Sequence, residues 1–281
     1  MYRELYRFGG VTFALESDAP LERSPVCEAF RVPDGVPDHT ICLRFSDALP
    51  TPPADALRRN DVFRWQAGAQ RHLLQWVSAP GDIPHFTYAV TNGAHTDVAF
   101  ACAYRTGASV STVLEAAGLF DVFAARGMLV LHSAYIVTRT GEAILFSGPS
   151  GIGKSTQAAL WQRCAGARVV NGDRALVDVG KKTANGIFYA GTSGISENVT
   201  APVRAIVLLG QGSENRVFVP SPQAAFAGVL SQCAYYDWDV SSAEKMTACA
   251  ARLVSDVPVL RMDCLPDATA VETLRGKLGG I

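Results

Sequence analysis

The chain has 281 residues, of which 48% are hydrophobic, so it can form one large domain or two smaller ones with a substantial core. Its formal net charge of −1 and the lack of Lys or Arg runs argue against binding to nucleic acid or to an acidic membrane surface. Its apolar segments are too short to span a bilayer, and the first ten residues lack the apolar core of a secretory signal. We therefore expect a cytoplasmic protein.

The cysteines and most histidines show no ligand spacing. The seven cysteines are scattered and form no C-x-x-C pair, which is typical of reduced thiols and argues against a disulfide framework or a zinc site. His39, His72, His85 and His95 also share no ligand spacing, so we expect them in surface or packing roles.

The first part of the chain alternates apolar and polar side chains, as half-exposed antiparallel strands do. The alternation is clearest at 11–16, 41–45, 63–65, 86–90 and 98–104. We expect residues 1–108 to be a β-rich accessory region that helps to recognise a substrate, and residues 109–281 to be the catalytic domain.

Helices and strands then follow one another. Apolar residues at helical spacing predict a helix over 109–127, with Ser111 as its N-cap. Strands are expected at 129–137 and 143–146, and a helix at 155–164.

Short strands and helices alternate over the rest of the chain. Further strands are expected at 167–171, 174–179, 187–190, 203–209, 216–219 and 258–262, and helices after Ser221, at 241–255 and at 267–278. We expect strand 187–190 to form a hairpin with 174–179, and strand 167–171 to return beside 143–146.

The segment after strand 143–146 reads SGPSGIGKST and satisfies the Walker A pattern G-x-x-x-x-G-K-[ST] of a P-loop. Glycines let several backbone N–H groups converge on one phosphate chain, the lysine reaches the β- and γ-phosphates, and the hydroxyl holds Mg²⁺. A chance glycine-rich turn is the alternative. The residues expected to bind the nucleotide are Gly148, Pro149, Ser150, Gly151, Ile152, Gly153, Lys154, Ser155 and Thr156.

Phosphoryl transfer with Mg²⁺ also needs a carboxylate to hold the metal or to accept the proton. Asp173 and Asp263 each follow an apolar strand. Asp263 would suit a motor-like or transporter-like ATPase, whose second carboxylate lies far downstream. We favour Asp173, because Asp263 is better explained as the end of a tail strand.

Residues 131–179 resemble the catalytic core of HPr kinase/phosphorylase. That family has a strand that begins with His, a G-x-S-G-x-G-K-S loop, a helix and an R-L-V-x-D-D strand, which His132, residues 150–155 and Arg168-Val169-Val170 match. The resemblance implies an α/β fold, namely a P-loop domain with a mixed β-sheet and flanking helices like that of phosphoenolpyruvate carboxykinase, preceded here by the β-rich region.

The resemblance also implies a reaction, which is transfer of phosphate from ATP to a serine. The sequence departs from the family at Gly172, where the first of two paired acids is expected, and at Thr156, where the enzymes that act on HPr usually have Glu. HPr itself is therefore a poor fit as the acceptor, and we expect a peptide or another small protein.

The expected roles follow from this mechanism. Lys154 holds the phosphates, Ser155 and Asp173 hold Mg²⁺, and Asp173 or Glu197 accepts the hydroxyl proton. Arg204 is expected to neutralise charge on the transferring phosphoryl group.

His132 is expected to contact phosphate or to support a residue that does, and a packed core histidine is the alternative. The polar loop at 191–198 either covers the phosphates or is a plain connection.

The expected function is thus an ATP- and Mg²⁺-dependent serine kinase. Two alternatives stay open, namely a nucleotide-binding regulatory module without catalysis, and a carboxykinase-like or small-metabolite kinase. The missing acid at Gly172 favours the first, and Arg174 and Arg204 are the cations available for the second. The sequence leaves open the acceptor, the oligomeric state, and whether ATP, GTP or pyrophosphate is the donor.

Overall fold

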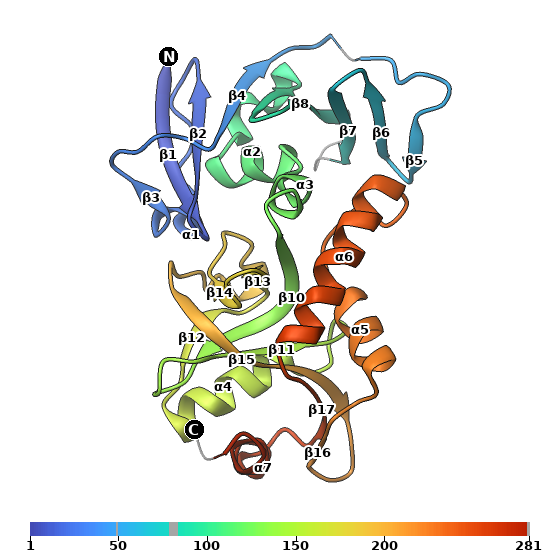
Figure 1. The fold of residues 1–281 in the computed structure, drawn as a ribbon. Coiled ribbons are helices and arrows are strands. Elements are labelled where there is room, and N and C mark those ends of the chain that lie inside the picture. Colours follow the sequence, from blue (N-terminus) through green and yellow to red (C-terminus); the bar gives the residue numbers. More distant parts are fainter. Residues whose placement is uncertain (49, 79–83, 280–281) are drawn as a thin grey trace. The chain divides into compact units, whose positions relative to one another are not determined.

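The computed structural model describes residues 1–48, 50–78 and 84–279, and the chain divides into two compact units (Figure 1). Unit 1 comprises Met1–Val122 and Tyr236–Val240, and unit 2 comprises Phe123–Tyr235 and Ser241–Ile281. None of the described helices is long and apolar enough to cross a membrane. The predicted roles of residues 1–108 and 109–281 stay predictions, because compactness does not say what a unit does.

Unit 1 is β-rich, as the alternation predicted. Its described residues form a sheet in the order β3-β1-β2-β4-β9-β8-β7-β6-β5. The strands are β1 (Tyr2–Phe8), β2 (Val11–Ser17), β3 (Arg31–Val32), β4 (His39–Phe45), β5 (Leu57–Arg59), β6 (Val62–Ala67), β7 (Gln70–Ser78), β8 (Pro84–Asn92) and β9 (His95–Phe100). Most neighbours are antiparallel, but the β2–β4 and β4–β9 pairs are parallel, which corrects the expectation of antiparallel strands throughout.

Short helices accompany this sheet: α1 (Pro25–Glu28), η1 (Cys102–Gly107), α2 (Val110–Ala116) and α3 (Leu119–Ala124), of which α3 runs on into unit 2. The prediction of one helix over 109–127 capped by Ser111 is wrong. Ser109 is the cap, since its side chain accepts a hydrogen bond from the Thr112 N–H at 3.3 Å. Gly118, at φ 64°, then separates α2 from α3, because a left-handed residue ends a helix.

Unit 2 is a mixed α/β structure (Figure 1). Its strands are β10 (Met128–Val137), β11 (Ala143–Ser147), β12 (Arg168–Asn171), β13 (Arg174–Asp178), β14 (Thr183–Asn185), β15 (Thr200–Gln211), β16 (Arg216–Phe218) and β17 (Val259–Cys264). Its helices are α4 (Lys154–Ala165), η2 (Gly191–Ser193), α5 (Pro222–Leu230), α6 (Val240–Asp256) and α7 (Ala268–Lys277), and Ser221 caps α5 as predicted. β11, β15 and β17 run parallel to one another, and the other pairs are antiparallel.

Strand β10 organises this sheet because it pairs with β11, β12 and β13. The prediction that the strand after helix α4 returns beside β11 is therefore wrong, since β10 lies between β12 and β11. The predicted hairpin between 174–179 and 187–190 is also wrong. The partner of β13 is β14, and the structure assigns no strand to residues 187–190 within the described part.

Strand β11 is buried on both faces, and the helix that follows it packs on one of them. Ala143 and Leu145 contribute to one hydrophobic cluster, and Ile144 and Phe146 to another. The second cluster also contains Trp161 of α4, whose ring centroid lies 6.3 Å from that of Phe146. The helix after β11 is therefore held against the sheet by its own aromatic side chain.

Trp161 is 1% exposed, so Trp161→Ala should lower the free energy of unfolding by about 3–5 kcal/mol. Native-state hydrogen exchange at the amides of β11 and β15 measures this loss. Trp76, which is 37% exposed, offers a matched control. Trp76→Ala should change the free energy of hydrogen exchange at the same amides by less than about 0.5 kcal/mol. Equal effects of the two variants would contradict the packing described here.

Candidate functional site

A cavity of about 320 Å³ in unit 2 lies where β11 ends and β13 begins. The register of β10 creates it, because Ser133 is paired with Ser147 at the end of β11, while His132 is paired with Arg174 at the start of β13. The segment that follows β11 and the residue that precedes β13 therefore meet beside His132. The lining includes His132, Lys154, Asp173 and residues 190, 192 and 193.

The glycine-rich loop (residues 148–153) connects β11 to α4. Gly148, Gly151 and Gly153 have φ values of 147°, 78° and 110°, which L side chains rarely adopt. A Cβ at Gly148 would also lie 3.2 Å from Ile152 Cγ2 and 3.4 Å from the carbonyl oxygen of Leu209. The loop thus needs glycine at these positions, and it ends at the N-terminus of α4, where backbone N–H groups are unpaired and the helix dipole is positive.

Lys154 begins α4 and is 7% exposed. Its Nζ donates to the carbonyl oxygens of Gly148 at 2.9 Å and Pro149 at 3.0 Å. Burial lowers the pKa of Lys154, and the charge of Asp173 partly opposes this. The site therefore contains a cation that is removed from water and is held by dipoles.

Asp173 faces this cation across the cavity. Its Oδ1 lies 3.4 Å from His132 Nε2, and its Oδ2 accepts a hydrogen bond from Arg174 Nε at 3.2 Å. The hydrogen bond from His132 lowers the pKa of Asp173 most, burial opposes this, and the charges of Arg174 and His132 add to the lowering. Asp173 is therefore an ionised carboxylate whose orientation is fixed by two side chains.

Asn171, at the end of β12, sets the position of Asp173, a role that no motif or spacing in the sequence predicts. It is fully buried, and its Oδ1 accepts hydrogen bonds from the N–H groups of Asp173 at 2.9 Å and Arg174 at 2.8 Å. Its Nδ2 donates to the carbonyl oxygen of Ile187 at 2.8 Å. This Asx-type turn bends the chain between β12 and β13 so that Asp173 points into the cavity.

The space beside Gly172 is filled by Ser193. A Cβ at Gly172 would lie 2.3 Å from Ser193 Oγ and 2.7 Å from Ser193 Cβ. A Cβ at Gly191 would likewise lie 2.8 Å from Asp173 Cβ and Cγ. The 191–193 turn therefore packs closely on residues 172–173, and Gly172, where the first of the two paired acids was expected, has no room for a side chain while Ser193 is there.

The structure places Glu197 and Arg204 elsewhere. Glu197 forms an ion pair with Arg168 at the opposite end of β12 from Asp173. Arg204 is near the beginning of β15, where its guanidinium donates to the Leu278 carbonyl oxygen at 2.7 Å and lies 4.0 Å from Glu142. Neither side chain is in the lining of the unit 2 cavity in the described part of the chain, so the structure does not bring them to Asp173, and their predicted roles stay predictions.

Asp263, the rejected carboxylate, is within β17 and is held by Arg261 Nε at 3.1 Å. It is separated from β11 by β15 and is not in the lining of the cavity in the described part of the chain.

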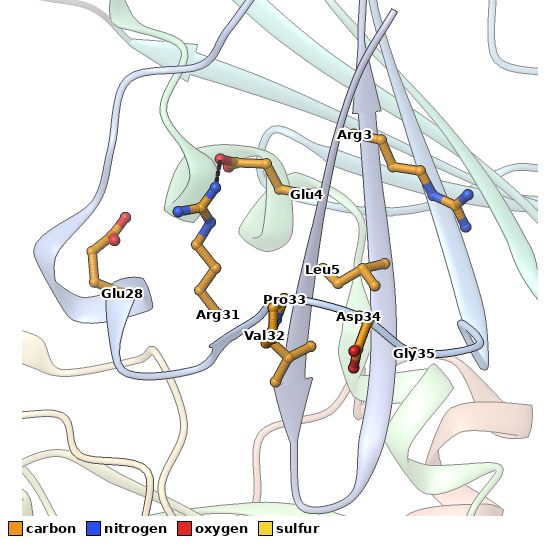
Figure 2. Close-up of a pocket in the computed structure, with 9 residues that line it drawn as sticks. All are labelled: Arg3, Glu4, Leu5, Glu28, Arg31, Val32, Pro33, Asp34 and Gly35. Atoms are coloured by element: carbon orange, nitrogen blue, oxygen red, sulfur yellow. Dashed lines mark ion pairs between the residues drawn. The ribbon is translucent and has the colours of Figure 1, made fainter.

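A larger cavity, of about 690 Å³, lies in unit 1 along β1 and the Arg31–Gly35 segment (Figure 2). Arg31 there holds Glu4 at 3.0 Å, and Arg3 holds Glu16 at 3.4 Å. The two arginines of this cavity are thus already paired with carboxylates. The smaller cavity in unit 2 is the better candidate for an anion site, because Lys154 there is hydrogen-bonded to neutral carbonyl groups.

The histidines of unit 1 were expected in packing or surface roles. His39 Nε2 lies 2.8 Å from Thr96 Oγ1, and His72 Nδ1 lies 2.6 Å from the Tyr88 hydroxyl, as packed histidines do. The side chain of His85 lies outside the described residues.

No family model matches the chain, and no curated protein matches it. Among solved structures, it is similar to the HPr(Ser) kinase/phosphatase from Coxiella burnetii, with 16% sequence identity and a TM-score of 0.25. The alignment covers 54% of this chain and 93% of that chain. At this identity and TM-score the likeness is a weak structural relationship, and it implies nothing about activity.

The contact between Gly172 and Ser193 predicts a coupling. Gly172→Ala should destabilise the chain by about 1–3 kcal/mol, because the added methyl group would overlap Ser193. In a Ser193→Gly background the same change should cost less, with a coupling energy of about 1 kcal/mol or more. Urea denaturation of the two single variants and the double variant measures this.

Gly180→Ala is the control, because its methyl group would meet Asp178 Oδ1 at an ordinary 3.5 Å. Additive effects of the Gly172 and Ser193 changes would show that the two residues are not in contact.

The lowered pKa of Asp173 predicts a pH dependence. A carboxyl group whose pKa is lower in the folded chain stabilises it above the unfolded pKa of about 4, and that contribution is lost as the pH falls through the folded pKa. The difference in free energy of unfolding between wild type and Asp173→Asn should therefore be constant near neutral pH and shrink below about pH 4.

Denaturant titrations at a series of pH values test this, with the exposed Asp55→Asn as the control. A difference for Asp173→Asn that stays the same down to the lowest pH would contradict the ionised, hydrogen-bonded state of Asp173.

Proposed function

We propose that the unit 2 cavity binds the phosphates of ATP, and that the chain is an ATP- and Mg²⁺-dependent kinase that phosphorylates a serine of a peptide or small protein. One observation carries this proposal, namely the buried ammonium group of Lys154, which lies at a glycine-rich loop and a helix N-terminus and faces an ionised Asp173.

The glycine-rich loop and α4 fit a phosphate chain. N–H groups at a helix N-terminus bind anions, and the dipole of the helix adds to the attraction. Lys154 adds a full positive charge. The two backbone carbonyls at 2.9 and 3.0 Å stabilise this charge as dipoles but do not neutralise it. Phosphate oxygens are stronger acceptors for an ammonium group than neutral carbonyls are. The ammonium group of Lys154 can therefore exchange its hydrogen bonds to the loop for hydrogen bonds to the phosphates of a nucleotide.

Two oxygen-bearing side chains of the cavity fit Mg²⁺. Ser155 is exposed at the start of α4, and Asp173 is ionised because its pKa is lowered. Hydroxyl and carboxylate oxygens are the ligands that this hard cation prefers, together with phosphates of the substrate. When bound, Mg²⁺ supplies charge neutralisation between the β- and γ-phosphates.

In this proposal Asp173 also accepts the proton of the attacking hydroxyl. His132 and Arg174 each hold one of its carboxylate oxygens, which fixes the carboxylate and leaves lone pairs on both oxygens. Because phosphoryl transfer has a loose transition state, an oriented acceptor with a low pKa is sufficient. His132 then acts as a positioning residue for Asp173.

The exposed residues Thr192 and Ser193 form one side of the cavity, where an acceptor would enter. A serine of a peptide is the acceptor that the sequence resemblance to HPr kinase implies, and ATP is the donor that it implies.

A regulatory module that binds the nucleotide without transferring phosphate is the second candidate. Ser193 occupies the space beside Gly172, where the related kinases have an acid, and this observation favours the module. The two candidates share the binding site and differ in whether phosphate leaves the nucleotide.

Lys154→Met should abolish ATP binding and reduce phosphate transfer by at least about 100-fold, because it removes the positive charge that would contact the β- and γ-phosphates and roughly keeps the volume of the buried side chain. The measurements are calorimetric titration with Mg²⁺–ATP, and mass spectrometry of serine-containing peptides and small proteins encoded beside the gene. Lys181→Met is the matched control, since Lys181 is 71% exposed and should be dispensable.

Transfer by the wild type that Lys154→Met abolishes supports the kinase. ATP binding without transfer or hydrolysis supports the module, and the absence of ATP binding overturns both candidates.

A further inference from the structure

Cys42, His95 and Asp97 are brought together on one face of the unit 1 sheet. Cys42 in β4 is paired with Asp97 in β9. His95 precedes Asp97 by two positions in β9, and residues two apart project from the same face of a strand. The buried side chains of β4, such as Ile41 and Leu43, alternate with Cys42 and pack on the opposite face.

The donor atoms of these side chains are close enough to share one ion. One ligand atom from each of the three residues lies within 4.8 Å of those of the other two. His95 Nε2 is 3.3 Å from Asp97 Oδ1, and both side chains are 44% exposed, so solvent and ions reach them. The cluster therefore combines a thiol, an imidazole and a carboxylate at the separations of ligands around a single metal.

We propose that Cys42, His95 and Asp97 bind Zn²⁺. Thiolate, imidazole and carboxylate are the three donor types that Zn²⁺ takes in proteins, and a tetrahedral ion has room for a fourth ligand. A mixed S/N/O set favours Zn²⁺ over Mg²⁺ or Ca²⁺, which prefer oxygen ligands alone.

Glu16 is placed to complete the site. Its Oε2 accepts a hydrogen bond from Cys42 Sγ at 3.4 Å, and its Oε1 lies 3.4 Å from Arg3 Nε. Glu16, Cys42 and Asp97 are cross-strand neighbours on β2, β4 and β9, because Glu16 is paired with Cys42 and Cys42 with Asp97. The contact with Arg3 holds Glu16 in this position. The fourth ligand is Glu16 or a water molecule held by it.

Binding involves no redox step. The Cys42 thiol releases its proton to solvent, its sulfur bonds to Zn²⁺, and the His95–Asp97 contact is replaced by bonds from both to the ion. The ion then links β4 to β9, two neighbouring strands in the interior of the sheet, and stabilises the folded chain by mass action.

The test uses the untagged full-length chain after treatment with a chelator. Titration with Co²⁺ as a spectroscopic probe should give a thiolate-to-cobalt charge-transfer band that saturates at one ion per chain. Zn²⁺ should displace the cobalt, and it should raise the thermal unfolding midpoint.

Variants identify the ligands. Cys42→Ser should abolish the charge-transfer band, and His95→Ala and Asp97→Asn should weaken Zn²⁺ affinity by at least the roughly 10–100-fold that loss of a supporting residue costs. Cys102→Ser is the matched control, because Cys102 is an exposed cysteine of unit 1 outside the cluster. Circular dichroism confirms that each variant is folded, and the near-isosteric Asp97→Asn keeps the test decisive if Cys42→Ser fails to fold.

Saturation at one ion, lost with Cys42→Ser and kept with Cys102→Ser, supports the site. The proposal is overturned if the wild type shows no saturable band, or if Cys42→Ser or Asp97→Asn binds Zn²⁺ as tightly as the wild type does.

Discussion

The buried ammonium group of Lys154 is the constraint on which the site depends. A charge that is taken out of water is costly unless it is paired and hydrogen-bonded. Here the carbonyl oxygens of Gly148 and Pro149 hold it, and burial still lowers its pKa. This arrangement requires the left-handed glycines that turn those carbonyls toward α4, and it leaves the cation suited to an anionic ligand.

Strand β10 supplies the rest of the geometry. Its pairing with β13 ends at His132, and its pairing with β11 begins at the next residue, Ser133. This register brings the end of β11 and the start of β13 together, so that Lys154 and Asp173 line one cavity. Asn171 and the turn at 191–193 then fix the backbone beside Asp173. The geometry of this cavity is thus set by sheet register.

Local patterns predicted much of the fold and part of the site. The glycine-rich loop, the start of α4 and the strand that contains His132 are short-range features, and their chemistry can be read from adjacent residues. The β-rich region followed from the period of two, but its parallel β2–β4 and β4–β9 pairs did not.

Long-range pairing explains what the sequence could not predict. Glu197 and Arg204 have suitable chemistry, but they contact Arg168 and Leu278 and are not in the lining of the cavity in the described part of the chain. The contact between Gly172 and Ser193 depends on a turn that approaches from further along the chain. The cluster of Cys42, His95 and Asp97 likewise exists only through the β4–β9 register, so spacing along the chain gives no sign of it.

The most direct test of the central claim is a crystal structure with Mg²⁺ and a non-hydrolysable ATP analogue. In that structure Lys154 Nζ should leave the carbonyl oxygens of Gly148 and Pro149 and contact the β- and γ-phosphates, with Ser155 and Asp173 at the metal. A nucleotide bound elsewhere, or a Lys154 that keeps both carbonyl contacts beside bound phosphate, would contradict it.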